Sequence, residues 1–159
     1  MNPVTHLLFS ITVMLLGFYP EVSMLEIVIF SLVFSVFLDM DMLIAKVIYR
    51  PYDRLRTWIQ EPAGFFIIGV PVGLVLSTLQ QYYLYLTLVP YALHIVLDYM
   101  STYTVSPLAP FDPYKVDRRG FAFSLWPAPV WQDEDEGVPE LFLIVVLALS
   151  LAYTWFNII

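Results

Sequence analysis

The sequence predicts an all-α, polytopic membrane protein with about five transmembrane helices and an interfacial cap. Hydrophobic residues make up 60% of the 159 residues and charged residues only 13%, a composition outside the usual range of soluble domains. Five apolar windows approach the length needed to cross a hydrocarbon core of about 30 Å. They cover residues 4–19, 24–37, 63–79, 82–96 and 141–159. The second and fourth windows are long enough only if Asp39 and Asp98 are included.

The basic residues predict the orientation of the chain. All seven fall in two connecting segments, between the second and third windows and between the fourth and fifth: Lys46, Arg50, Arg54, Arg56, Lys115, Arg118 and Arg119. With five spans these segments lie on one side, which the positive-inside rule makes cytoplasmic. We expect a multi-pass protein of the cell (inner or plasma) membrane with a cytoplasmic N-terminus. The first helix is expected to stay in the mature protein, because no basic stretch precedes it.

The connecting segments predict the cap. The first is expected to hold a short helix that Pro51 interrupts, followed by an amphipathic stretch with Trp58 and Ile59 at the interface. Pro62 fits the first turn of the third helix. Residues 101–139 are rich in proline, aspartate and aromatic residues, which indicates an ordered cap followed by a solvated acidic linker. Because no repeat or second domain is evident, residues 1–159 are expected to form one integral membrane domain.

Two glycines in the third window predict close helix packing. Gly69 and Gly73 have the GxxxG spacing, which lets two helix backbones approach each other. We interpret the pair as a packing feature, because a motif of this length is weak evidence for anything more.

The histidines and several carboxylates are expected at the cytoplasmic helix ends. On the predicted topology, six side chains reach one face of the membrane: His6, Asp39, Asp41, Glu61, His94 and Asp98. The i, i+4 spacing places His94 and Asp98 on one side of their helix, where they can serve one metal ion or an orienting hydrogen bond. Ionisable residues in apolar helices are costly, and they therefore point to a function.

Imidazole and carboxylate ligands suit a divalent metal ion, zinc in the first place, with manganese or iron as alternatives. The chain has no cysteine, which excludes thiolate ligands and favours an open site over a closed structural zinc site. A bound cation lowers the pKa of its water and neutralises a phosphoryl oxygen, which favours hydrolysis of a phosphate ester. Glu61 or Asp41 would take the proton from the water, and Arg54, Arg56 or Arg119 would hold the phosphate.

These residues resemble the motifs of the YdjM-type family of membrane-bound, metal-dependent hydrolases. The matching pieces are Thr5-His6, Asp39-Met40-Asp41, and the segment from His94 to Asp98 followed by Pro110-Phe111. The resemblance covers about the first 115 residues, and its specificity comes from the order of the motifs combined with the helix pattern. The family is distantly similar to zinc-dependent phospholipase C and P1-type nucleases, which implies phosphodiester or phospholipid hydrolysis by analogy.

The resemblance implies a set of metal ligands: His6, Asp39, His94 and Asp98, with Asp41 as a further one. Family members commonly carry a histidine after the acidic pair and a histidine-containing segment ahead of the third helix. This chain has Met42 and residues 54–61 at those places. The differences imply fewer metal ions, a replacement of imidazole by the Glu61 carboxylate, or an inactive relative.

Two other classes of function stay open. In a non-enzymatic membrane scaffold, the same polar residues form a buried hydrogen-bond network and the acidic loop at residues 133–136 recruits a soluble partner. In a small transporter, His94 and Asp98 relay protons; the outer halves of the helices are nearly all apolar, which ranks this class last. Expected partners are membrane lipids and an amphiphilic or phosphorylated substrate, whereas nucleic acid is not expected as a main partner.

Overall fold

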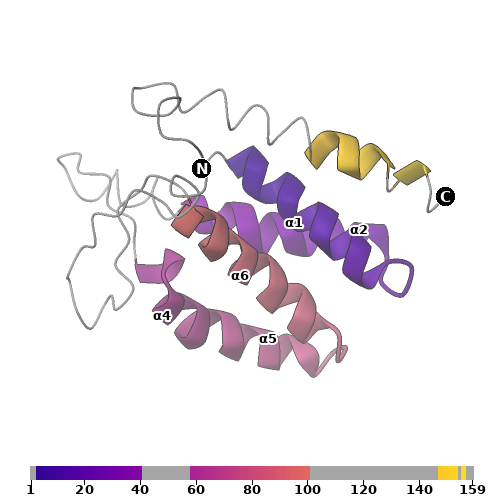
Figure 1. Ribbon diagram of the computed structural model, residues 1–159. Helices are drawn as coiled ribbons and strands as arrows, with labels where there is room; N and C mark the ends of the chain where they lie inside the picture. Colours follow the sequence, from indigo (N-terminus) through magenta and orange to yellow (C-terminus); the bar gives the residue numbers. More distant parts are fainter. Residues whose placement is uncertain (1–2, 41–57, 101–146, 154, 157–159) are drawn as a thin grey trace, which may run out of the picture.

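The computed structural model describes residues 3–40, 58–100, 147–153 and 155–156 (Figure 1), and most of these residues are helical. Residues 147–153 and 155–156 form a C-terminal helical segment. The order of the other elements is α1 (Pro3–Phe18), α2 (Met24–Ser31), η1 (Leu32–Val36), η2 (Phe37–Asp39), η3 (Trp58–Gln60), α4 (Pro62–Gly64), η4 (Phe65–Gly69), α5 (Val70–Ser77) and α6 (Tyr83–Met100). Of these, η1 and η4 are π-helical, whereas η2 and η3 are 3-10 helices.

The helices form an antiparallel bundle around α6. α1 lies beside α2 and α5 beside α6, and the two members of each pair run in opposite directions (Figure 1). α6 is central, because it packs against α1, α2, η1, η4 and α5. The C-terminal helical segment runs beside α1, and its Leu151 packs against the core (Figure 1). The beginning of α1 and the end of α6 lie at the same end of the bundle, so that polar residues of these two elements can meet there.

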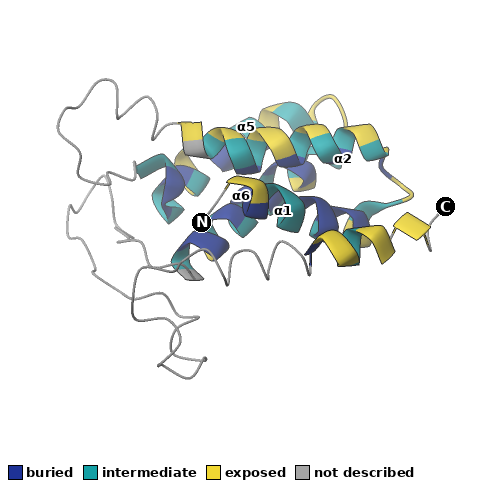
Figure 2. Cartoon of the chain, turned by 90° about the horizontal axis from the view of Figure 1, so that it is seen from above, coloured by how far each residue is buried: buried dark blue, intermediate teal, exposed yellow. Residues whose placement is uncertain are grey.

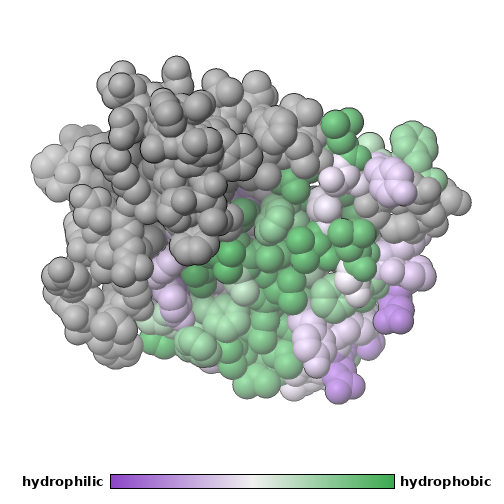
Figure 3. All heavy atoms as spheres, viewed as in Figure 1, coloured by the Kyte–Doolittle hydropathy of each residue, from purple (hydrophilic) through white to green (hydrophobic). Residues whose placement is uncertain are grey.

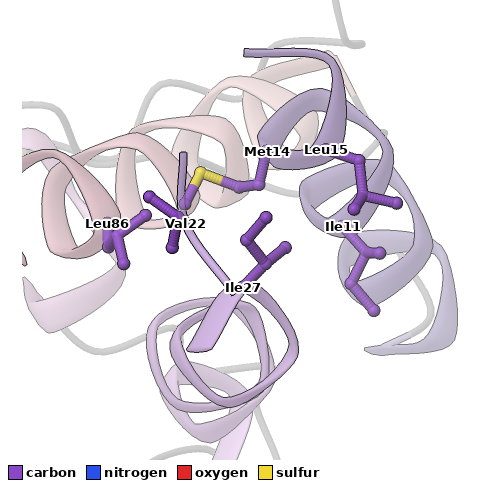
Figure 4. Close-up of a cluster of buried hydrophobic side chains, with 6 residues drawn as sticks. All are labelled: Ile11, Met14, Leu15, Val22, Ile27 and Leu86. Atoms are coloured by element: carbon purple, nitrogen blue, oxygen red, sulfur yellow. The ribbon is translucent and has the colours of Figure 1, made fainter. Parts of the chain in front are cut away.

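The hydrophobic core occupies the other half of the bundle, near the turn between α1 and α2. Figure 4 shows Val22, Ile27 and Leu86 gathered around Met14. Buried residues line the inward faces of the helices and exposed residues the outward faces (Figure 2). The full cluster consists of Ile11, Met14, Leu15, Val22, Ile27 and Leu86.

Large apolar side chains also cover the outer surface. Five of them are about two-thirds exposed: Leu16, Leu25, Phe66, Val75 and Leu79. Figure 3 shows apolar residues over the middle of the described helices and hydrophilic residues at the right-hand end, over the turns between α1 and α2 and between α5 and α6. A continuous apolar surface of this kind marks a region of contact with a membrane or another protein.

The GxxxG glycines lie where η4 and α5 approach α6. A Cβ atom on Gly69 would lie 2.6 Å from Cδ1 of Tyr91, and one on Gly73 would lie 3.0 Å from Cδ1 of Leu84. Tyr91 is buried, and its hydroxyl donates to the Ile59 carbonyl at 2.6 Å. The tyrosine ring therefore has little room to move, and the geometry agrees with the packing interpretation of the motif.

A carboxylate ties α2 to α6 at the end of the bundle that carries the core. Oε1 of Glu26 accepts hydrogen bonds from the hydroxyls of Tyr82 at 3.0 Å and Tyr83 at 2.9 Å. Ser23 and Glu26 form a capping box at the start of α2. The hydrogen bonds, that from Ser23 first, lower the pKa of Glu26. The same carboxylate raises the pKa of Tyr83 to about 12.

The expectation of five transmembrane helices is wrong. Among the helices of the described residues, none is both long enough and apolar enough to cross a membrane. α1 has 16 residues and rises about 24 Å, less than a hydrocarbon core of about 30 Å. α6 has 18 residues, but His94 and Asp98 in its last two turns make it more polar. The expected second and third spans pass into π-helical or 3-10 turns, and most of the expected cap lies outside the described residues.

Replacing Gly69 with alanine should destabilise the fold by about 1–3 kcal/mol, the usual cost of overpacking, because the new methyl group meets the buried Tyr91 ring. The matched control is Gly17→Ala in α1, where a Cβ would have nothing within 4 Å. That variant should be neutral or more stable by up to about 1 kcal/mol. Thermal unfolding in detergent compares the two. Equal unfolding temperatures would show that η4 and α6 do not make this contact.

Replacing Glu26 with glutamine should reduce thermal stability at neutral pH but not at acidic pH. The pKa of Glu26 in the folded protein lies below its ordinary value of 4.5. Its carboxylate therefore contributes stability above that value, and the contribution is lost as the pH falls through the folded-state pKa. The gap in unfolding temperature between wild type and Glu26→Gln should narrow from about pH 7 to about pH 3.5. A gap that widens towards acid would contradict the assigned hydrogen bonds.

Candidate metal centre

Two histidines and one aspartate converge at the end of the bundle shared by α1 and α6. His94 and Asp98 lie in the last two turns of α6, and His6 lies in the first turn of α1. Nε2 of His6 is 3.2 Å from Oδ1 of Asp98, and Nε2 of His94 is 3.1 Å from Oδ2. The histidine side chains are 0% exposed and the aspartate side chain 5%. Each oxygen of one buried carboxylate therefore faces one imidazole.

Stacking of the two imidazole rings fixes their relative orientation. The ring centroids of His6 and His94 are 4.2 Å apart, and the planes differ by 25°. This arrangement turns both Nε2 atoms towards the same aspartate. The three residues together offer ligand atoms that all lie within 4.8 Å of one another. The sequence-predicted meeting of His6, His94 and Asp98 is thus present in the fold.

A backbone carbonyl orients the His94 ring. Nδ1 of His94 lies 2.7 Å from the carbonyl oxygen of Ser35, in the π-helical turn η1. Because a carbonyl only accepts hydrogen bonds, Nδ1 is the nitrogen that carries the hydrogen. In the neutral imidazole the lone pair is then on Nε2, the atom that faces Asp98. Metal-binding histidines almost always donate their second N–H to such a partner.

The charges of this group favour a cation at its centre. An imidazole lone pair and a carboxylate oxygen 3.1 Å apart are both acceptors, and they repel unless a proton or a metal ion lies between them. Ligand atoms bound at about 2.0–2.1 Å to a tetrahedral zinc ion are about 3.3 Å apart. The two separations to Asp98 are close to this value. The residues present therefore fit a divalent cation with two nitrogen ligands and one carboxylate ligand.

Glu61 lies at a neighbouring position and has a different partner. It is the N-cap residue of α4 and is 1% exposed. The hydroxyl of Tyr99 donates to Oε2 of Glu61 at 2.6 Å. Next to it, Nε2 of Gln60 donates a hydrogen bond to the carbonyl of Leu38 at 2.9 Å. This bond joins η3 to η2. Glu61 is not among the three residues of the candidate metal group within the described chain.

The structure does not describe the side chains of the other residues predicted for the site. Asp39 is the last residue of η2, and its side chain is not described. Asp41, Arg54, Arg56 and Arg119 lie outside the described residues. Their predicted roles as further ligand or base and as phosphate-binding residues stay predictions.

Sequence reasoning missed two partners of the site. Ser35 contributes a main-chain carbonyl, which any residue type could supply, so that no side-chain motif announces it. Tyr99 binds Glu61 from α6. No sequence motif indicates this contact, because it joins residues 38 positions apart.

Comparison with known proteins gives the family. The whole chain, residues 1–159, matches the family described as YdjM inner membrane protein, and the chain therefore belongs to this family. No curated protein and no solved structure matches the chain. The membership confirms the family expected from the sequence motifs and its association with the inner membrane. The distant similarity to phospholipase C and P1-type nucleases has no match among these comparisons.

Proposed function

We propose that this member of the YdjM inner membrane protein family is a metal-dependent hydrolase of a phosphate ester, with a divalent cation held by His6, His94 and Asp98. The observation that carries the proposal is the buried approach of two imidazole Nε2 atoms to one carboxylate. The engagement of the His94 Nδ1 hydrogen by Ser35 prepares that ring for a metal ion. Zinc is proposed first, because it accepts nitrogen and carboxylate ligands together, with manganese or iron as alternatives.

A site with three protein ligands keeps a coordination position for water or substrate, as in catalytic zinc centres. When bound, the ion would supply a water of lowered pKa and a positive charge for a phosphoryl oxygen. Asp39 and Asp41 are proposed as further ligands, because η2 ends at Asp39 after η1 has packed against α6.

Glu61 is proposed as the general base, with Asp41 as the second choice. The hydroxyl of Tyr99 orients the Glu61 carboxylate through Oε2, and the carboxylate is shielded from bulk water. A buried, oriented carboxylate is suited to accept a proton from a nearby water. Arg54, Arg56 and Arg119 are proposed to bind the phosphate group, because guanidinium groups pair with phosphate oxygens in a bidentate manner.

The candidate metal centre is proposed to face the cytoplasm at the membrane surface. All seven basic residues lie in two segments, one after Met40 and the other after Met100. Met40 and Met100 both lie at the end of the bundle that carries the centre. Basic segments are retained on the cytoplasmic side. The exposed apolar side chains of the outer helix faces fit contact with lipid. The substrate would then be an amphiphilic or phosphorylated molecule reached from the membrane.

A second candidate function is a non-catalytic membrane scaffold. The observation that favours it is the burial of the candidate metal group, whose histidine side chains are 0% exposed. In this alternative a proton rather than a metal ion lies between His94 and Asp98, and the group only joins α1 to α6. The two candidates differ in metal content, which can be measured directly.

His94→Ala and Asp98→Asn should each lower the bound metal at least about tenfold, because each removes one of three ligands. Metal content per chain is measured by elemental analysis after gentle extraction, and helix content by circular dichroism. The matched control is Tyr85→Ala, which truncates an exposed side chain of the same helix and should leave the metal content unchanged.

Stoichiometric metal in His94→Ala would contradict the ligand assignment. Wild-type protein that is folded, carries no metal and gains no thermal stability from added zinc would favour the scaffold. Metal in wild type that disappears in both variants, with unchanged helix content, supports the metal centre.

Glu61→Gln should reduce the turnover of an activated phosphodiester with a nitrophenol leaving group by about 10²–10⁴-fold, because it removes the proton acceptor. Its metal content should equal that of wild type, since Glu61 is not one of the three proposed ligands. Tyr99→Phe removes only the orienting hydrogen bond, and we expect a smaller loss of about tenfold. Full activity in Glu61→Gln would contradict the assignment of the base.

A further inference from the structure

An apolar crevice lies on the surface between α4 and η4 on one side and α6 on the other. Its cavity volume is about 190 Å³. Every lining residue is apolar, and none belongs to the candidate metal group. The lining residues are Pro62, Phe65, Phe66, Ala92, Ile95 and Val96.

Local structure explains the shape of the crevice. Phe65 and Phe66 begin the π-helical turn η4 and contact each other edge to face at a centroid distance of 5.3 Å. Phe65 also packs against the buried Tyr91 ring at 5.7 Å. On the opposite wall, the small Ala92 side chain leaves space that a larger residue would fill. The inner wall of the crevice is thus held by the contact of Phe65 with Tyr91, whereas Phe66 and Val96 form its exposed rim.

The crevice leads to the Glu61–Tyr99 pair. Ala92, Ile95, Val96 and Tyr99 follow the i, i+3, i+4, i+7 spacing and share one face of α6. On the other wall, Pro62 directly follows Glu61 in the chain. The hydrogen bond between Tyr99 and Glu61 therefore joins the two walls beside the lining residues at one end of the crevice. Tyr99 directly follows Asp98 in α6, so that this end of the crevice is at the same level of the helix as the metal group, on a different face.

We propose that the crevice binds an acyl chain of a membrane phospholipid, so that the lipid headgroup is presented at the Glu61–Tyr99 end. A lining without polar atoms offers no hydrogen bond to a polar ligand, and the volume is below that of typical small-molecule sites. The rim residues Phe66 and Val96 are 67% and 51% exposed. In an inner membrane protein such a rim opens onto lipid, and an alkyl chain is the ligand that matches it. As a substrate site, the crevice rests on the proposed function.

The test is photolabelling of the full-length protein in vesicles that contain a phospholipid with a diazirine in its acyl chain. We expect adducts to concentrate in residues 62–66 and 92–96, above the labelling of the exposed α5 residues Leu74 and Val75. Ala92→Trp fills the crevice and should lower labelling of residues 62–66 about tenfold, the loss expected when about two methylene groups are no longer buried. The matched control is Leu74→Trp, which adds the same ring on an exposed face and should leave this labelling unchanged.

Uniform labelling of all exposed apolar residues, or undiminished labelling of residues 62–66 in Ala92→Trp, would overturn the proposal. Metal content and nitrophenyl phosphodiester turnover are measured on the same samples. If these are normal while the labelling fails, the crevice assignment alone is wrong. If metal is absent while the labelling is specific and sensitive to Ala92→Trp, the crevice binds lipid but the hydrolase proposal is wrong. Because Phe66 is exposed, Phe66→Ala serves as a second variant that opens the crevice, and it should also reduce labelling of residues 92–96.

Discussion

The Asp98 carboxylate, buried between the imidazoles of His6 and His94, is the interaction on which this end of the bundle depends. An ionised carboxylate removed from water costs several kcal/mol unless its charge is compensated. A proton or a cation held between the carboxylate and the Nε2 atoms would supply the compensation, and α6 alone provides only one of the two imidazoles. α1 therefore has to begin where α6 ends, so that His6 can reach the second carboxylate oxygen. The contacts of Asp98 at one end of the bundle thus fix the position of α1 relative to α6. The apolar faces of the same two helices meet at the other end.

The two π-helical turns η1 and η4 both pack against α6, and each lies next to a feature of the proposed function. η1 carries the Ser35 carbonyl that orients His94. η4 carries the two phenylalanines that line the apolar crevice. π-helical turns are uncommon and are often found at functional sites, because the extra residue per turn redirects neighbouring groups. η1 interrupts the expected second span and η4 the expected third span. The turns that shape the candidate site therefore also explain why two of the five expected spans are not continuous α-helices.

The sequence predicted the parts of the structure that follow from local periodicity and from charge. The apolar windows correspond to helices, and the i, i+4 spacing predicted that His94 and Asp98 share a face. The meeting with His6 followed from the antiparallel order of the helices. Three things were out of reach. A main-chain acceptor such as the Ser35 carbonyl has no residue signature, the pairing of Tyr99 with Glu61 joins segments 38 residues apart, and hydropathy windows do not report where a helix becomes π-helical.

Burial of the metal group bears on the kind of substrate that the proposed hydrolase would use. A small soluble phosphate ester brings little binding energy with which to displace the side chains that cover such a group. An amphiphile with an alkyl chain gains binding energy away from the reacting atoms, and an enzyme can use remote binding energy to position the reacting group. The lining of the apolar crevice includes Pro62, which directly follows Glu61, the proposed base. Binding of a chain there would therefore place the headgroup beside Tyr99 and Glu61, while the candidate metal centre stays covered from bulk water.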